Sequence, residues 1–118
     1  MPFSRTFLGA AVVSLGLLLG AAPSGGPDAT AQSAEQAFMQ AAEKMNRGMM
    51  AKPMVGNADE DFASMMIAHH QGAIDMANVE LQYGTDPELR AVAQKVIDDQ
   101  TKEIETLQRW QKGRTPVQ

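Results

Sequence analysis

Two clusters of helix-breaking residues divide most of this chain into three segments with helical periodicity. Pro53 and Gly56 form the first cluster, and Gly84 and Pro87 form the second. Proline lacks the backbone N–H that a helix interior needs, and glycine commonly ends helices, so neither cluster fits inside a helix. The marks of strands, which are alternating apolar residues, β-branched runs and Asn-Gly turns, are scarce or missing. The sequence therefore predicts an all-α fold.

Each segment opens with residues suited to a helix N-terminus. Ser33 with Gln36 and Asn57 with Glu60 have the spacing of capping boxes, and Pro87 suits the first position of a helix. Gly84 is expected to end the second helix in a left-handed conformation. We therefore expect helices over residues 33–51, 57–83 and 87–113.

Apolar residues recur every three or four positions in each segment, so each helix should carry one apolar stripe. The stripes run through Phe38, Ala42, Met45 and Met49; through Phe62, Met66, His69, Ala73, Met76 and Glu80; and through Leu89, Ala93, Val96, Gln100, Glu103, Leu107 and Trp110. We expect each stripe to pack against the others in an antiparallel three-helix bundle. Because the first helix is shorter, part of the other two stays uncovered, which predicts completion of the bundle by a homodimer.

The N-terminal part has the pattern of a secretory signal. A single charge at Arg5 precedes an apolar run over residues 7–19, and small residues and helix breakers follow. That run is short for a membrane span. We expect cleavage after Ala31; cleavage after Ala22 and an uncleaved anchor are the alternatives. Residues 1–31 are thus a signal peptide with a Pro/Gly linker, and residues 32–118 form the helical bundle domain of a periplasmic or secreted protein.

The composition limits how such a domain holds together and what it binds. The chain has no cysteine and nine methionines. An exported domain of this size without disulfides must rely on packing, on oligomerisation or on a metal ion. The net charge is −4, with no long basic run, which argues against nucleic acid as a partner and, once the signal is removed, against a membrane surface.

Both histidines of the chain are adjacent, and each follows a methionine by four positions. Met65 precedes His69, and Met66 precedes His70. Because residues four apart lie on one face of a helix, each pair places a thioether beside an imidazole. Such donors suit copper. A zinc site of four Cys or His ligands is impossible with this composition, and neither histidine has the glutamate three residues earlier that a di-iron bundle uses.

Helix pairing predicts where these donors gather. Residues at equal distance from a turn should lie level, which places His69 beside residue 100 or 101 and Met45 beside Met65 and Met66. One layer should then contain Met45, Met65, Met66, His69, Gln100 and Glu103, with His70 at its edge and Met49 and Met76 about a turn away. The purely structural alternatives are a core histidine bonded to Gln100 or Glu103 and methionines that only fill the core.

The residues around the histidines resemble the signature of the domain-of-unknown-function 305 family. The matching blocks span residues 61–77, 83–90 and 100–110. The resemblance implies an exported, ferritin-like helical bundle, in a family that includes a periplasmic copper-binding protein linked to copper resistance. It implies copper ligands at Met65, Met66, His69, His70 and Met76, with Met45 and Met49 from the first helix. Asn46 and Leu107 stand where the family often has His and Met, which implies fewer ligands here.

The leading hypothesis is an exported protein that binds copper, with Cu(I) favoured, through these methionines and histidines. Gln100 or Glu103 would orient a histidine, and the role would be copper buffering, trafficking or resistance, with the donor or acceptor protein unknown. An enzyme is not expected, because nothing activates a nucleophile and no substrate pocket can be argued; a cuproenzyme is the weakest reading. The alternative is a metal-free structural or protein-interaction module whose polar layer only sets the register of the helices.

Overall fold

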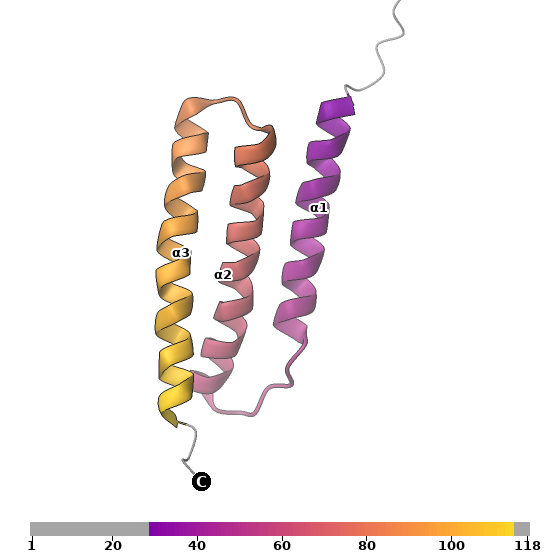
Figure 1. Cartoon of the computed structure of the whole chain (residues 1–118). Coiled ribbons are helices and arrows are strands. Elements are labelled where there is room, and N and C mark those ends of the chain that lie inside the picture. The colour runs from indigo at the N-terminus through magenta and orange to yellow at the C-terminus, as the bar shows by residue number, and fades with distance from the viewer. Residues whose placement is uncertain (1–28, 115–118) are drawn as a thin grey trace, which may run out of the picture.

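A computed structural model describes residues 29–114, which form three α-helices and no strand. They are α1 (Ala29–Met50), α2 (Ala58–Tyr83) and α3 (Pro87–Arg114). Successive helices run in opposite directions (Figure 1). The prediction of an all-α, three-helix fold is confirmed. None of the helices within this part of the chain combines the length and the apolar character needed to cross a membrane.

The N-termini of α2 and α3 are both capped, and the cap of α2 is the predicted Asn57. The side-chain Oδ1 of Asn57 accepts hydrogen bonds from the backbone N–H groups of Asp59, at 3.1 Å, and Glu60, at 3.2 Å. Asp86 does the same for the backbone N–H groups of Glu88, at 2.9 Å, and Leu89, at 3.0 Å. These bonds satisfy N–H groups that have no partner inside the helix.

The expected start of α1 is wrong, whereas the expected end of α2 at Tyr83 is confirmed. Helix α1 begins at Ala29, so Ser33 lies inside the helix and does not cap it. Most of the expected signal peptide lies outside the described residues, but cleavage after Ala31 would remove the first three residues of α1. Gly84 is extended, with φ −72°, and not left-handed. A glycine fits at residue 84 because of close packing, since a Cβ atom there would lie 2.7 Å from the carbonyl oxygen of Glu80.

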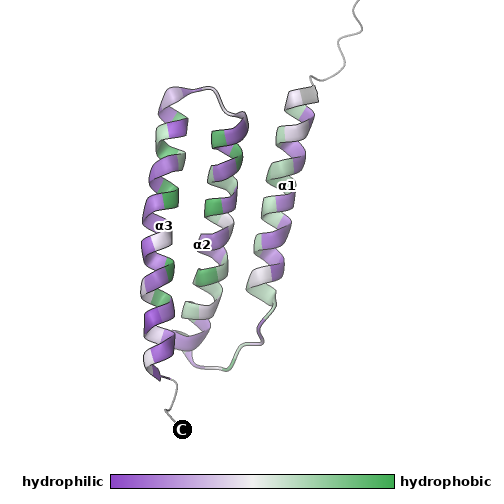
Figure 2. Cartoon of the chain, viewed as in Figure 1, coloured by the Kyte–Doolittle hydropathy of each residue, from purple (hydrophilic) through white to green (hydrophobic). Residues whose placement is uncertain are grey.

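The three helices form a single layer with α2 in the middle (Figure 1). Helix α2 packs against both neighbours, whereas no Cα atom of α1 lies within 8 Å of one in α3. The expectation that every helix packs against the other two is therefore wrong for this pair. The hydrophobic residues concentrate along the facing sides of α2 and α3, and the outer side of α3 is hydrophilic (Figure 2).

The middle position of α2 explains which of its residues are buried. Ala63, His70 and Ala77 are spaced by seven and so share one side, and Gly72 and Val79 share another. Residues 70 and 72 point about 200° apart on a helix. Helix α2 thus buries two opposite sides. The predicted stripe through Phe62 lies between these sides: Phe62 and His69 are exposed, and the other stripe residues, Met66, Ala73, Met76 and Glu80, are half-buried.

The exposure of Phe62 and Leu89 corrects the expected core. These residues are 59% and 56% exposed, although both were placed in buried stripes. The buried apolar residues are small ones: Ala41, Ala63, Ala77, Val79 and Ala93. Small residues let the helix backbones approach closely, and Gly72 is the clearest case. A Cβ atom on Gly72 would lie 2.4 Å from Cγ of Met45 in α1.

Candidate metal centre

His70 is the buried histidine of the layer. It is 8% exposed and lies on the side of α2 that packs against α3, where its Nε2 atom is 2.7 Å from Oε2 of Glu103. His69 is exposed. The sequence predicts His69 in the layer and His70 at its edge, and the structure reverses these positions. The reason is the double-sided burial of α2, because His70, and not His69, shares a side with Ala63 and Ala77.

Glu103 determines which nitrogen of His70 can act as a donor. A carboxylate only accepts hydrogen bonds, so the proton of the neutral imidazole belongs on Nε2, which donates to Glu103. The Nδ1 atom then carries a free electron pair. It is buried and has no hydrogen-bond partner among the described residues. A histidine bonded to a carboxylate through one nitrogen and open at the other is the usual form of a metal-binding imidazole.

Two further donor side chains lie within one helical turn of His70. Met66 is half-buried and precedes His70 by four residues. The ring of His69 is edge-on to that of His70, with centroids 6.0 Å apart. The expected contact between Glu103 and a histidine is present, but the histidine is His70 and not His69. Gln100 is half-buried on α3 and is not among the hydrogen-bond partners of His70.

Met45 and Met76 lie elsewhere in the layer. Met45 packs against Gly72, at the interface of α1 with α2. Met76 lines an apolar groove between α2 and α3 together with Leu89, Val92 and Val96. The predicted ligands therefore do not meet in a single layer.

The register of α1 against α2 explains why Met45 is displaced. Equal distances from the turn predict that Met45 lies level with Met65 and Met66, but Met45 lies against Gly72, about two helical turns further along α2. Helix α1 ends at Met50, whereas α2 begins only at Ala58, beyond the end of α1 (Figure 1). The assumption of equal distances from the turn fails because the connection is long. Between α2 and α3 the same assumption is accurate to within one helical turn, because the connection between these two helices is short.

Met49 and Met65 meet at the connection between α1 and α2. They line a cavity of about 290 Å³ together with Met50, Met54 and Asp61. Met49 and Met65 are among the predicted ligands, whereas Met50 and Met54 are not. The signal that could have linked them is their position on both sides of the α1–α2 turn.

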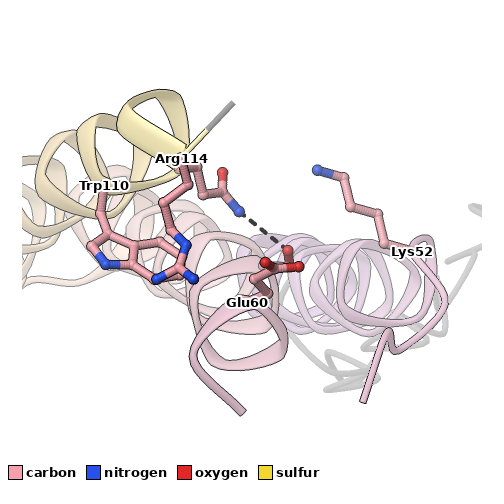
Figure 3. A pocket seen from close by; sticks show the side chains of 6 residues that line it. Lys52, Glu60, Trp110 and Arg114 are labelled. Atoms are coloured by element: carbon pink, nitrogen blue, oxygen red, sulfur yellow. Dashed lines mark hydrogen bonds between the residues drawn. The ribbon is translucent and has the colours of Figure 1, made fainter. Parts of the chain in front are cut away.

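A second pocket, at the end of the layer, lacks every predicted ligand. Lys52, Glu60, Trp110 and Arg114 line it, and the Arg114 guanidinium stacks 4.7 Å from the Trp110 ring centroid (Figure 3). Its charges are mixed. Within residues 29–114 no three His, Asp, Glu or Cys side chains form a group that could hold a metal.

The clear pKa shifts lie on α3, one turn from Glu103. A hydrogen bond from Lys95 holds the pKa of the Asp99 carboxyl below its ordinary value, and the same bond raises the pKa of Lys95. These residues are four apart, the spacing of a helix-surface ion pair. The pair is exposed, so it contributes little to the stability of the domain.

Comparison with known protein families finds one family model that matches most of the chain. The family model described as Domain of unknown function (DUF305) matches residues 18–111. The chain belongs to the DUF305 family. This confirms the resemblance seen around the histidines, and the DUF305 match includes both of them, Glu103 and the methionines of the cavity. A comparison with curated proteins gives no match. The DUF305 description assigns no activity, so the likeness to a copper-binding member stays a prediction.

Proposed function

We propose that this DUF305 protein binds copper, as Cu(I) in preference to Cu(II), in the periplasm or outside the cell. His70 and Met66 are the central ligands, and His69 lies close enough to join them. The protein buffers or carries the ion, for copper trafficking or resistance, and is not an enzyme.

The geometry of His70 carries the proposal. Its Nε2 is held by Glu103 at 2.7 Å, and its Nδ1 is buried without a partner. Leaving a buried acceptor unpaired costs about 1–3 kcal/mol, and a metal ion bound to that nitrogen would offset this cost. The purely structural reading of the polar layer explains the bond to Glu103 but leaves Nδ1 without a role.

The donor types favour copper over harder metals. Thioether sulfur selects Cu(I), and imidazole accepts either oxidation state of copper. Zinc sites in proteins use Cys, His and carboxylate ligands, and those side chains do not gather in sufficient number in the described part of the chain. A site built from Met66, His69 and His70 therefore fits a soft ion best.

The test is a titration of the signal-free protein with Cu(I) against a competing chelator. Glu103→Ala should weaken binding by about 10–100-fold, the usual effect of losing a carboxylate that orients a ligating histidine. Glu105→Ala is the matched control, since it removes an exposed acidic residue from the same helix. Equal affinity of the two variants would reject His70 as the central ligand. Met66→Leu should also weaken binding.

The exposed apolar groove supports a second candidate, an interaction module. Met76, Leu89 and Val92 line this groove, and Leu89 and Val92 are 56% and 54% exposed. A second copy of the chain that covered this face would complete a ferritin-like bundle of helices. Sedimentation that shows only monomer at high concentration would contradict the dimer, and failure to bind copper would leave the interaction module as the better candidate.

A further inference from the structure

Four methionine side chains surround one cavity where α1 turns into α2. Met49 and Met50 come from the last turn of α1, Met54 from the connecting loop, and Met65 from α2. The cavity has a volume of about 290 Å³. It contains no imidazole, so its donors differ in kind from those around His70.

Core packing does not account for two of these methionines. Met50 is 81% exposed and Met54 is 69% exposed. Methionine often fills irregular gaps in a core, but side chains this exposed fill none. Their thioethers are instead free to turn toward the cavity, because methionine has three rotatable side-chain bonds.

The loop that carries Met54 is held in place by Asp61. One carboxylate oxygen accepts a hydrogen bond from the backbone N–H of Val55, at 2.8 Å, and the other accepts from Gly56, at 3.1 Å. Gly56 has a φ of +79°, a left-handed conformation that favours glycine. Asp61 thus fixes the loop against the start of α2 and keeps Met54 beside the other methionines.

The charges at the cavity balance each other. Asp61, which is negatively charged, and Lys52, which is positively charged, both line it. Both oxygens of Asp61 already accept backbone hydrogen bonds, so Asp61 acts as a positioning residue. The remaining donors are the sulfur atoms of the methionines, with the hydroxyl of Ser64.

We propose that this methionine cavity is a second metal site, built from thioethers and specific for a soft monovalent cation such as Cu(I). The choice of ion rests on the proposed copper-binding function, but the residues are separate from His70 and Glu103. Thioether ligands select Cu(I) over harder cations. The cavity therefore excludes Cu(II) and zinc, and it holds its ion whether or not the imidazole site is intact.

The experiment follows the methyl groups of the methionines by NMR during a titration with Ag(I). Ag(I) serves as a soft monovalent probe that does not change oxidation state under these conditions. The protein carries ¹³C-methyl methionine, and single Met→Leu variants assign the signals. The methyl signals of Met49, Met50, Met54 and Met65 should shift together at one equivalent of Ag(I). The signal of Met39 should not, although Met39 is 58% exposed, because it lies outside the cavity.

Paired variants then test the stoichiometry. Met50→Leu with Met54→Leu should remove one bound Ag(I), whereas Met39→Leu should remove none. Both altered side chains are exposed, so the fold should persist, and circular dichroism checks that it does. Asp61→Asn, which weakens the hold on the loop, should lower the affinity of the cavity without changing its ligands. Unchanged stoichiometry in the double variant, or shifts of Met39 equal to those of Met54, would overturn the proposal.

A His70→Gln variant separates this inference from the proposed function. If the cavity signals still shift in that variant, the thioether site stands by itself. If copper binding depends on His70 while the cavity signals stay unmoved by Ag(I), the second site is rejected and the proposed function survives. If the cavity binds Ag(I) and replacement of His70 changes no copper affinity, the methionine site stands and the proposed role of His70 in copper binding is rejected.

Discussion

Replacing Gly72 by alanine should destabilise the domain, although alanine is the better helix former. A Cβ atom at this position would lie 2.4 Å from Cγ, 2.5 Å from Cβ and 2.7 Å from Sδ of Met45. The contact with Cβ matters most, because that atom is fixed to the backbone of α1 and cannot rotate away. Helix α1 itself must then move away from α2.

The two opposing effects can be compared in size. Alanine gains up to about 1 kcal/mol over glycine inside a helix, whereas forcing an extra carbon into a packed interface costs roughly 1–3 kcal/mol. The net loss of stability is then about 1 kcal/mol, which lowers the melting temperature by roughly 4–8 °C for a domain of this size. Thermal unfolding followed by circular dichroism measures this change.

Other glycines provide matched controls for this prediction. A Cβ atom on Gly113 would meet nothing within 4 Å, so Gly113→Ala should not destabilise the domain. A Cβ atom on Gly48 would lie 3.2 Å from Cβ of Ala68, so the change in melting temperature for Gly48→Ala should lie between those of Gly72→Ala and Gly113→Ala. In a Met45→Gly background, which lacks the opposing Cβ atom, the extra penalty of Gly72→Ala should disappear. If Gly72→Ala alone raises the melting temperature, then Met45 does not pack against α2 as described, and it becomes a better candidate for a copper ligand.

Two further predictions concern the helix cap and the pH dependence of copper binding. Asn57→Ala removes the acceptor for two backbone N–H groups and should cost about 1 kcal/mol of stability, which urea unfolding measures. Replacement of the exposed Gln82 by alanine is the control. Equal unfolding midpoints for the two variants would contradict the role of Asn57 as a cap. Copper affinity should fall on acidification, because protons compete with the metal for imidazole nitrogen. A chelator competition repeated at several pH values measures this, and affinity that does not change with pH would mean that no imidazole binds the ion.

The sequence was sufficient for the elements whose ends depend on local chemistry. Asn57 and Asp86 bond to the N–H groups that follow them within two or three residues, so these helix starts could be read directly. The start of α1 could not, because Ser33 suits a cap equally well whether or not the helix extends beyond it. The contact of Glu103 with a histidine was also predictable, since the turn between α2 and α3 is short and keeps the two helices in register.

The identity of the buried histidine depended on the number of neighbours of α2. A stripe analysis assumes that a helix has one buried face, and for α2 this assumption selects His69 and the residues in line with Phe62. A helix between two others buries two opposite sides, and the stripe between them is left facing solvent. Methionine spacing alone cannot distinguish these cases, because it contains no information on how many helices pack around α2. This arrangement therefore makes two roles compatible in one chain: His70 on a buried side of α2, with Met66 one turn away, can bind a metal, and the apolar residues of the exposed groove can be covered by another molecule.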